Sequence, residues 1–274
     1  MRRRIADNPS VSQPIKITSR IRLRDLDPNH CDGLDKDETR EKTRELCERI
    51  GELQHLLYAN ASHAVIILLQ GMDGSGKDST GARVLEFVTP AGVQTANFKA
   101  PSAEELAHDF LWRIHKAVPR YGCIGLFNRS HYEDVLIVRV LGLQPDKVWR
   151  ARYEQINAFE KLLADNRVVL LKFFLHISKE EQAERLRERL ENPTKHWKFS
   201  VADLKMRERW GDFQGAYEDA INRCSSKHAP WQVVPANRKW FRDYVVAGTV
   251  VDALEQLKLK WPKCKDDLSH VNIK

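Results

Sequence analysis

The chain has 274 residues, of which 42% are hydrophobic and 30% charged, as expected for one globular domain with a substantial core. Its net charge of +7 predicts an anionic partner, which on charge alone could be a nucleic acid, an acidic membrane or a phosphorylated small molecule. The longest apolar run, Ala64 to Leu69, is far shorter than the roughly 20 residues that span a membrane, and no apolar signal core follows the basic start, so we expect a cytoplasmic protein without a membrane partner. The five cysteines show no C-x-x-C spacing and predict neither a disulfide framework nor a zinc site.

Residues 1–35 are polar and contain three prolines without a sustained period, which predicts an extended N-terminal arm on a domain over 36–274. The first helix is predicted over Asp37 to Asn60. Apolar residues recur there at steps of four, three and four from Leu46 to Leu57, and so share one helical face.

Four short apolar runs predict buried strands, and helical patterns separate them. A β-α alternation of this kind is typical of an α/β fold with a parallel sheet flanked by helices. The runs are Ala64 to Leu69, Cys123 to Phe127, Val168 to Leu175 and Trp231 to Val234.

Capping signals and apolar periodicity predict the helices between and after these strands. One helix is expected from Thr80 to Phe87, and the next begins at the capping box of Ser102 and continues through Trp112 and His115. Another helix is expected to direct Trp149, Tyr153, Ile156, Phe159 and Leu163 toward the core. A further helix is capped by Ser178 and ends at Asn192-Pro193, and the last helix runs from Arg238 to about Lys260. Met206, Trp210, Phe213 and Tyr217 mark an apolar helical stripe in the segment before the last strand.

A phosphate-binding loop is predicted directly after the first buried strand, because Gly71-Met-Asp-Gly-Ser-Gly76-Lys77 fits the pattern G-x-x-x-x-G-K. Glycines let successive backbone N–H groups face one anion, and the helix N-terminus and the lysine add positive charge. The alternative is a glycine-rich turn with an incidental lysine, which this spacing and context disfavour. The predicted phosphate-binding residues are Gly74, Ser75, Gly76, Lys77, Asp78 and Ser79.

The position after the lysine holds Asp78, where the usual motif has the Ser or Thr that binds Mg²⁺. A carboxylate beside bound phosphate is tolerated when a divalent cation lies between them, so a replacement metal ligand is expected within the loop. We favour Asp73 for this role and assign Asp78 to the helix N-terminus. Both could instead simply complement the positive end of the helix dipole.

A second motif, Asn128 to Asp134, follows the second strand and is expected at the same edge of the sheet as the phosphate loop. A carboxylate at this position can hold Mg²⁺ directly or through water, and Arg129 can bridge phosphate oxygens. Spacing does not separate the roles of the adjacent Glu133 and Asp134. Arg139 is expected to project toward this site, although it could be a surface arginine. The alternative for the whole motif is a solvated helix start.

A helical lid is predicted over about 185–212, where basic residues follow the third strand and mobile lids of P-loop kinases close over phosphates. For Arg185 to Arg189, neighbouring glutamates make a solvated helix face equally plausible. Trp197 could stack on a base or pack the hinge of the lid. The cations assigned to phosphate binding are Lys195, Lys198, Arg207 and Arg209.

Together these motifs resemble the second polyphosphate kinase family. The similarity extends over nearly the whole chain from about residue 40 and includes Gly71-Met-Asp-Gly-Ser-Gly-Lys-Asp78, Phe127-Asn-Arg-Ser-His-Tyr-Glu-Asp-Val135, Lys195-His-Trp-Lys-Phe199, Ala229-Pro-Trp-Gln-Val-Val-Pro-Ala236 and Lys239-Trp240. Asn128 stands where other members have aspartate, so its contact with a metal is left open.

The resemblance implies a P-loop kinase-like fold with a helical lid, and a reversible, Mg²⁺-dependent transfer of phosphoryl groups between inorganic polyphosphate and nucleoside mono- and diphosphates. It also implies a homo-oligomer. It places Asp73, Lys77, Arg129, Asp134 and Arg139 at the family's catalytic positions, and we expect Asp73 and Asp134 to hold the Mg²⁺ and Glu133 to lie at the nucleotide site. Glu133 is similar to the acidic residue of the subgroup that phosphorylates both AMP and ADP.

Two other functions stay open on the sequence. An ATP-dependent P-loop kinase of nucleotides or small molecules would share the loop and the lid but use a compact donor. A basic nucleic-acid-binding protein would share the charge, but the chain carries no recognised nucleic-acid-binding motif, so we expect no nucleic acid as a partner.

Overall fold

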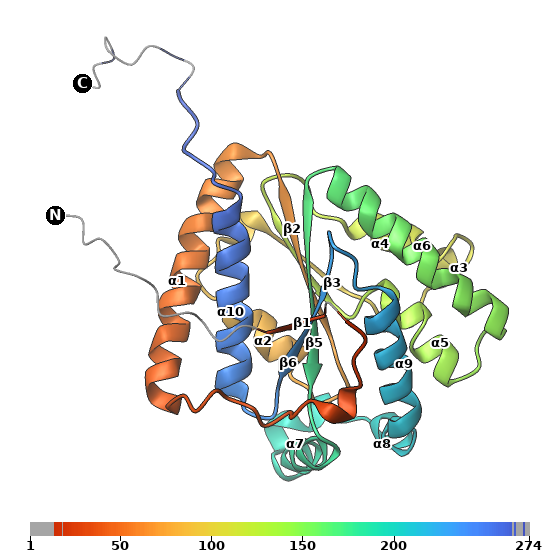
Figure 1. Ribbon diagram of the computed structural model, residues 1–274. Coiled ribbons are helices and arrows are strands. Elements are labelled where there is room, and N and C mark those ends of the chain that lie inside the picture. Colours follow the sequence, from red (N-terminus) through yellow and green to blue (C-terminus); the bar gives the residue numbers. More distant parts are fainter. Residues whose placement is uncertain (1–13, 18, 265, 267–270, 272–274) are drawn as a thin grey trace.

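The computed structural model describes residues 14–17, 19–264, 266 and 271 (Figure 1). Positions 1–13 and 18 of the predicted arm lie outside the described residues. So do positions 265, 267–270 and 272–274 of the predicted domain.

A six-stranded sheet of order β1-β6-β5-β2-β4-β3 forms the centre of the molecule. The four predicted strands are confirmed, and all pairs among β6, β5, β2, β4 and β3 are parallel. Their bounds are β2 (Ala64–Gln70), β4 (Ile124–Asn128), β5 (Val168–His176) and β6 (Trp231–Pro235). The predicted α/β fold with a parallel sheet is therefore correct.

Two strands were not predicted, and both lie at edges of the sheet. β3 (Val93–Asn97) pairs with β4, and β1 (Ile15–Lys16), within the predicted arm, pairs antiparallel with β6. β3 is half-exposed and its sequence is Val-Gln-Thr-Ala-Asn, so it lacks the continuous apolar run of a strand that is covered on both faces.

Helices cover both faces of the sheet (Figure 1). On one side lie α1 (Lys36–Asn60), α2 (Lys77–Val84) and α10 (Lys239–Gln256). On the other lie α3 (Ala103–Leu106), α4 (Trp112–Ala117), α5 (Ile137–Val140), α6 (Asp146–Asp165) and α9 (Trp210–Arg223). Near one end of the strands lie α7 (Lys179–Glu191) and α8 (Val201–Glu208). Short 3-10 turns η1 (Leu23–Asp25), η2 (Pro90–Gly92), η3 (His131–Asp134) and η4 (Pro193–Lys198) connect these elements.

The single helix predicted from Ser102 through Trp112 and His115 is wrong, because the chain forms α3 and α4 separately. The capping box at Ser102 and Glu105 is present. Between the two helices the Asp109 carboxylate accepts a hydrogen bond of 2.9 Å from the Leu111 amide, and this local turn competes with continuation of the helix. The cap of α7 at Ser178 and the end of α7 before Pro193 agree with the prediction.

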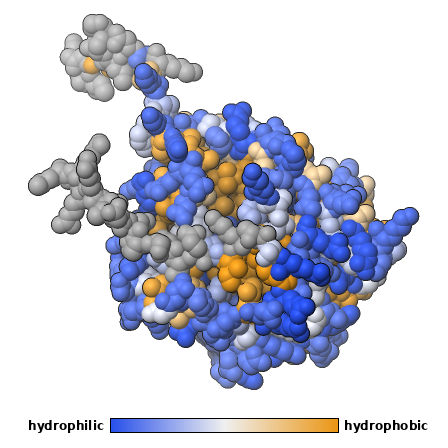
Figure 2. Space-filling model, viewed as in Figure 1, coloured by the Kyte–Doolittle hydropathy of each residue, from blue (hydrophilic) through white to orange (hydrophobic). Residues whose placement is uncertain are grey.

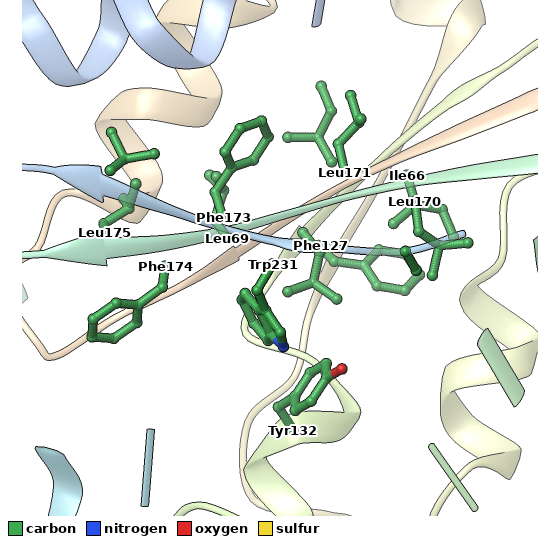
Figure 3. Packing of buried hydrophobic residues seen from close by; sticks show 14 of the residues in the cluster. Ile66, Leu69, Phe127, Tyr132, Leu170, Leu171, Phe173, Phe174, Leu175 and Trp231 are labelled. Atoms are coloured by element: carbon green, nitrogen blue, oxygen red, sulfur yellow. The ribbon is translucent and has the colours of Figure 1, made fainter. Parts of the chain in front are cut away.

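Large apolar side chains from neighbouring strands fill the core (Figure 3). Phe127, Phe173 and Trp231 are almost completely buried, and their removal from water is the main favourable contribution to folding. The ring of Tyr132 on η3 lies 4.7 Å from that of Trp231 in an edge-to-face arrangement. This contact packs the turn after β4 against the sheet. The predicted apolar stripe is divided between two helices, because Met206 lies on α8 and Trp210, Phe213 and Tyr217 lie on α9. Phe213 and Tyr217 are buried in the core, as expected.

The surface seen in the view of Figure 1 is mostly hydrophilic, with smaller hydrophobic areas between the polar side chains (Figure 2). In the part of the chain that the structure describes, no helix combines the length and the apolar character that a membrane span requires.

Candidate active site

The register of the sheet brings the predicted motifs to one edge. Leu69 of β2 lies beside Asn128 of β4 and beside Phe173 of β5, so these three strands end at nearly the same level. The phosphate loop, residues 71–77, therefore emerges next to the second motif. Because α2 begins at Lys77 rather than at Thr80, as the sequence suggested, the loop runs directly into a helix N-terminus.

Glycines shape this loop for steric reasons. Gly71 has φ 151° and Gly76 has φ 97°, which are conformations that residues with a side chain rarely adopt. A Cβ at Gly76 would lie 1.9 Å from the Nη1 atom of Arg242. The loop thus follows a path that only glycine allows at these positions.

Lys77 lies within the loop and is buried, with 9% of its surface exposed. Its Nζ donates hydrogen bonds of 2.8 Å to the Gly71 carbonyl and 3.3 Å to that of Met72. Burial lowers the pKa of this ammonium, because the charged form loses hydration. An anion beside Nζ would supply the charge that the protein partners do not.

A cavity of about 670 Å³, the phosphate-loop cavity, lies over the loop. Basic side chains outnumber acidic ones in its wall, which favours a polyanionic ligand. The basic ones are Lys77, Lys99, Arg129, Arg185, Arg189, Lys195, Lys198, Lys239 and Arg242. The acidic ones are Asp73, Asp78, Glu188 and Asp203. Of the other predicted residues, Gly74, Gly76, Ser79 and Asn128 also line it.

The two aspartates of the loop have protein partners inside this cavity. Asp73 Oδ1 accepts a hydrogen bond of 2.9 Å from Arg129 Nη2, and Asp78 accepts a close one from the Asn128 amide. Asn128 therefore contacts Asp78 directly. The structure brings these four predicted residues together as a connected group beside Lys77.

Arg129 joins the phosphate loop to the second motif. Its backbone is left-handed, with φ 62°, and its Nη1 lies 3.2 Å from Glu133 Oε2. The negative charge of Glu133, with a further contribution from Asp73, raises the pKa of Arg129 and keeps it charged. Ser75 is fully buried and, like Glu133, does not line the cavity.

Asp134 and Arg139 lie outside the wall of the phosphate-loop cavity. Asp134 Oδ1 is 3.0 Å from Arg152 Nη1, and its Oδ2 is 3.7 Å from Arg113 Nη2. Burial raises the pKa of the Asp134 carboxyl, and the two arginines oppose this effect. Arg139 pairs with Asp219 at 2.6 Å. Both predicted residues are thus engaged with partners far away in the sequence.

The basic residues of the predicted lid divide into two groups. Lys195 and Lys198 line the cavity, and so does Trp197, which is 79% exposed and carries the Lys198 ammonium 4.8 Å from its ring centre. Arg207 instead donates to the Lys179 carbonyl at 2.6 Å, and Arg209 pairs with Asp212 at 2.8 Å.

Of the arginines predicted at the start of the lid, Arg185 is buried at 7% exposure and is no solvated helix residue. Arg187 is exposed and pairs with Glu184, as expected for a solvated helix face.

Several residues in the cavity wall were not predicted. Lys99 follows the unpredicted strand β3, and Lys239 begins α10 beyond the end of β6, where the rule that ligands bind at the carboxyl ends of strands would have indicated it. Asp203 on α8 faces the same space. Burial and the nearby charge of Asp73 raise the pKa of its carboxyl. Arg242 also belongs to this group, whereas Arg189, which the sequence left open between a lid cation and a solvated helix face, lines the cavity as well.

The cavity wall shows which side chains could hold the predicted Mg²⁺. Among the described residues, no group of three or more His, Cys, Asp or Glu side chains could hold a metal ion. Asp73 and Asp78 do line the cavity together. Two carboxylates suit Mg²⁺, which usually keeps several waters and substrate phosphates among its ligands.

The parallel sheet, the glycine-shaped loop at a helix N-terminus and its buried lysine define a P-loop protein of the kinase-like α/β class. Residues 33–262 match the family model of polyphosphate kinase 2. The chain belongs to this family, as its sequence motifs suggested.

Relatives and a solved structure agree with this assignment. An AMP/ADP-polyphosphate phosphotransferase of Meiothermus ruber is 48% identical over 89% of this chain and 92% of its own length. An ADP-polyphosphate phosphotransferase of Rhodopseudomonas palustris is 43% identical over 83% of each chain. The crystal structure of polyphosphate kinase 2 from Arthrobacter aurescens TC1 is 40% identical and superimposes with a TM-score of 0.91 over 94% of both chains.

Proposed function

We propose that this protein is an enzyme that transfers phosphoryl groups from inorganic polyphosphate to nucleoside mono- and diphosphates. The observation that carries the proposal is the basic wall of the phosphate-loop cavity, which extends from Lys77 to the cations of α7, η4 and α10. A long polyanion needs successive positive contacts of this kind, whereas a compact donor does not. Two relatives named as polyphosphate phosphotransferases support the same conclusion.

A second cavity of about 400 Å³ supports a nucleotide as the acceptor. It shares Lys77, Asp78 and Asn128 with the phosphate-loop cavity and is otherwise lined mainly by apolar side chains of α2, η2 and β3. The polar atoms of Thr95 and Asn97 lie in its wall. A flat base fits such an apolar space with a few polar groups, next to the site where its phosphate would react.

In the proposed mechanism, Lys77 and the loop amides hold the migrating phosphoryl group, and Arg129 stabilises charge on its oxygens. The terminal phosphate oxygen of the acceptor attacks in line. Because this oxygen is already anionic near neutral pH, the protein need not supply a strong base, and catalysis consists of positioning and charge stabilisation.

Mg²⁺ would be held by Asp73 and Asp78, the two carboxylates that share the cavity with Lys77. Asp134, predicted as the second ligand, would first have to leave Arg152 or Arg113. When bound, the ion supplies charge neutralisation for the phosphate oxygens. Asn128 holds Asp78 in place through its amide.

We further propose that the segment from Asn192 to Arg209 moves as the lid. It is bounded by the break after α7 and by the boundary between α8 and α9, and it carries Lys195 and Lys198 into the cavity. Action in the cytoplasm, where nucleotides and polyphosphate are available, and a homo-oligomeric state remain proposals from the sequence.

Glu133 is proposed to set the acceptor range through Arg129, since its carboxylate contacts that guanidinium rather than the cavity itself. Glu133→Gln keeps the shape and removes the charge. We expect it to change the ratio of the rates with AMP and ADP about tenfold, whereas Glu184→Gln on the exposed face of α7 leaves the ratio unchanged. If Glu133→Gln leaves the ratio of the rates with AMP and ADP unchanged, Glu133 does not set the acceptor range.

The function is tested by incubating AMP or ADP with Mg²⁺ and long-chain polyphosphate as the only donor, and separating the products by chromatography. We expect ADP and ATP from AMP, ATP from ADP, and a steep loss of rate with added salt because a polyanion is bound. Parallel reactions use ATP as the donor for AMP. Product from ATP but none from polyphosphate would make the protein an ATP-dependent kinase instead.

A further inference from the structure

The carbonyl groups of residues 71–75 in the phosphate loop all accept hydrogen bonds from side chains. Lys77 binds those of Gly71 and Met72, as described above. Gln182 Nε2 donates to the Asp73 carbonyl at 2.8 Å. Arg185 Nη1 donates to the Gly74 carbonyl at 2.8 Å and to that of Ser75 at 3.1 Å, and the latter also accepts from Arg242 Nη1 at 3.2 Å.

Gln182 and Arg185 reach the loop from α7 and are themselves fixed. Gln182 is 1% and Arg185 7% exposed. The remaining donors of Arg185 are used by the Glu181 carboxylate at 2.7 Å and by the carbonyls of Ala236 and Asn237 at 2.6 and 3.0 Å. A guanidinium has five N–H donors, and all five have protein acceptors here. Arg185 thus borders the cavity without a donor left for a phosphate.

These contacts bear on the direction of the loop amides. In a planar trans peptide the C=O and the following N–H point to opposite sides, so a carbonyl held toward α7 directs that N–H away from α7. Carbonyl oxygens facing the cavity would also repel a phosphate. The Ser75 amide donates to the Met72 carbonyl at 3.0 Å, so the argument concerns the amides of Gly74 and Gly76, which follow the held carbonyls of Asp73 and Ser75. Donors from α7 therefore favour an arrangement of the loop in which these two amides face an anion.

We propose that Gln182 and Arg185 are positioning residues for phosphoryl transfer, which aim the amides of Gly74 and Gly76 at the polyphosphate by holding the carbonyls of Asp73 and Ser75. This proposal rests on the function proposed above.

Gln182 also connects the loop to the lid. Its Oε1 accepts a hydrogen bond of 2.9 Å from Arg207 Nη1, which fixes the orientation of the amide that donates to Asp73. Arg207, predicted from the sequence as a phosphate ligand, thus reaches the loop through Gln182. α7 is thus hydrogen-bonded to the loop, and the lid proposed above begins beyond α7.

Two variants test Gln182: Gln182→Met keeps the size of the side chain and removes its donor, and Gln182→Glu sets an acceptor against the Asp73 carbonyl. Arg185→Lys retains one donor group at position 185. Arg185→Met is the full truncation, and Arg187→Met on the exposed face of the same helix is its matched control. Thermal unfolding first establishes that each variant is folded. Steady-state rates with polyphosphate then give kcat and the KM for AMP, and calorimetry gives the affinity for tripolyphosphate.

We expect the Gln182 variants to lose kcat about tenfold or more with the KM for AMP nearly unchanged, since one misaligned donor in such a site costs on the order of 10² in rate. Tripolyphosphate binding weakens in parallel. Arg185→Lys recovers part of what Arg185→Met loses, and Arg187→Met equals the wild type. If Arg185→Met does not fold, the rates and affinities of the Gln182 variants and of Arg185→Lys decide whether these residues position the loop.

Folded Gln182 variants with wild-type kcat and wild-type affinity for tripolyphosphate would overturn the proposal. If the wild type itself makes no product from polyphosphate, the proposed function fails. Calorimetry then still decides whether Gln182 and Arg185 position the loop for an anion.

Discussion

Two groups of charged residues on the same sheet differ in how their charges are satisfied. Behind the second motif, Lys172 and Glu160 are fully buried, and Lys172 Nζ donates to Glu160 Oε2 at 2.6 Å, to Tyr132 Oη at 2.9 Å and to the Cys224 carbonyl at 2.7 Å. All three donors of that ammonium therefore have acceptors in the protein. In the phosphate-loop cavity, by contrast, Lys77 has only neutral carbonyl partners.

Burial lowers the pKa of both lysines, and the two groups differ in the carboxylate that contacts Lys172. Burial alone would raise the pKa of Glu160, but the nearby charge of Lys172 and the contact with His131 more than compensate, so the pKa is lowered. The pair is therefore held in its ionised form. At Lys77, burial outweighs the opposing charges of Asp73, Glu133 and Asp78 and lowers the pKa, so the protein alone favours the charged ammonium less than water does. The first group is complete within the protein, and we propose that phosphate groups of the substrate complete the second.

The largest expected effect is the loss of stability when the buried pair of Lys172 and Glu160 is broken. Lys172→Met leaves the Glu160 carboxylate buried without its counter-charge, and removal of one partner of a buried pair costs about 3–5 kcal/mol. Urea unfolding followed by circular dichroism measures this loss. Replacing both partners, with Lys172→Met and Glu160→Leu together, should restore much of the stability. A loss below about 1 kcal/mol in Lys172→Met would mean that the pair contributes little.

The next largest effect is on activity rather than stability. Lys77→Met removes the charge that faces the phosphate and should lower kcat by about 10²–10³-fold, while the free energy of unfolding stays equal or rises, because burial of the ammonium no longer has to be compensated. Rates and urea unfolding are measured on the same preparation. The control is Lys161→Met, which removes an exposed lysine paired with Asp165. A variant that unfolds easily but turns over normally would contradict the division between the two groups.

The pH dependence provides a third, smaller effect. Lys77 binds phosphate in its charged form, which exists below its pKa, so activity should fall as the pH rises through a value below that of a free lysine. A bound polyanion stabilises the charged form and raises this pKa. The alkaline decline of kcat/KM, which reports the free enzyme, should therefore occur at lower pH than that of kcat. Declines at the same pH, or none in this range, would argue against Lys77 as the group concerned.

The smallest effect is expected where an ion pair is complete but exposed. Arg49 on α1 pairs with Glu255 on α10 at 3.0 Å, and both side chains are more than 40% exposed. Because water already solvates and screens these charges, Arg49→Gln should lower the free energy of unfolding by less than about 1 kcal/mol. The same urea measurement as for Lys172→Met gives the comparison. A loss as large as that of Lys172→Met would show that pairing, and not burial, determines the cost.

The sequence was sufficient for the features that local chemistry determines. Continuous apolar runs predicted the four inner strands, and the glycine spacing predicted the phosphate loop with Lys77. β3 was missed because an edge strand such as Val93–Asn97 is half-exposed and needs no apolar run. Likewise, the periodicity around Ser102 gave no indication that a turn at Asp109 would divide the helix.

The candidate site was less predictable wherever a role depends on a distant partner. Asp134 and Arg139 have the residue types and sequence positions of site residues, but their observed partners, Arg152 and Asp219, lie 18 and 80 positions further along the chain. Gln182 gave no signal in the sequence, because an amide that supports a backbone carbonyl forms no motif. Such pairings follow from the packing of whole elements.

The most direct test of the proposed chemistry follows a label from donor to acceptor. Polyphosphate labelled with ³²P is incubated with unlabelled AMP and Mg²⁺ in the absence of ATP, and the products are separated and degraded to locate the label. We predict label in the β-phosphate of ADP and in the β- and γ-phosphates of ATP, together in an amount equal to that lost from polyphosphate, and none in the α-phosphate. Label appearing only as inorganic phosphate while AMP stays unchanged would contradict direct phosphoryl transfer and identify the protein as a hydrolase of polyphosphate.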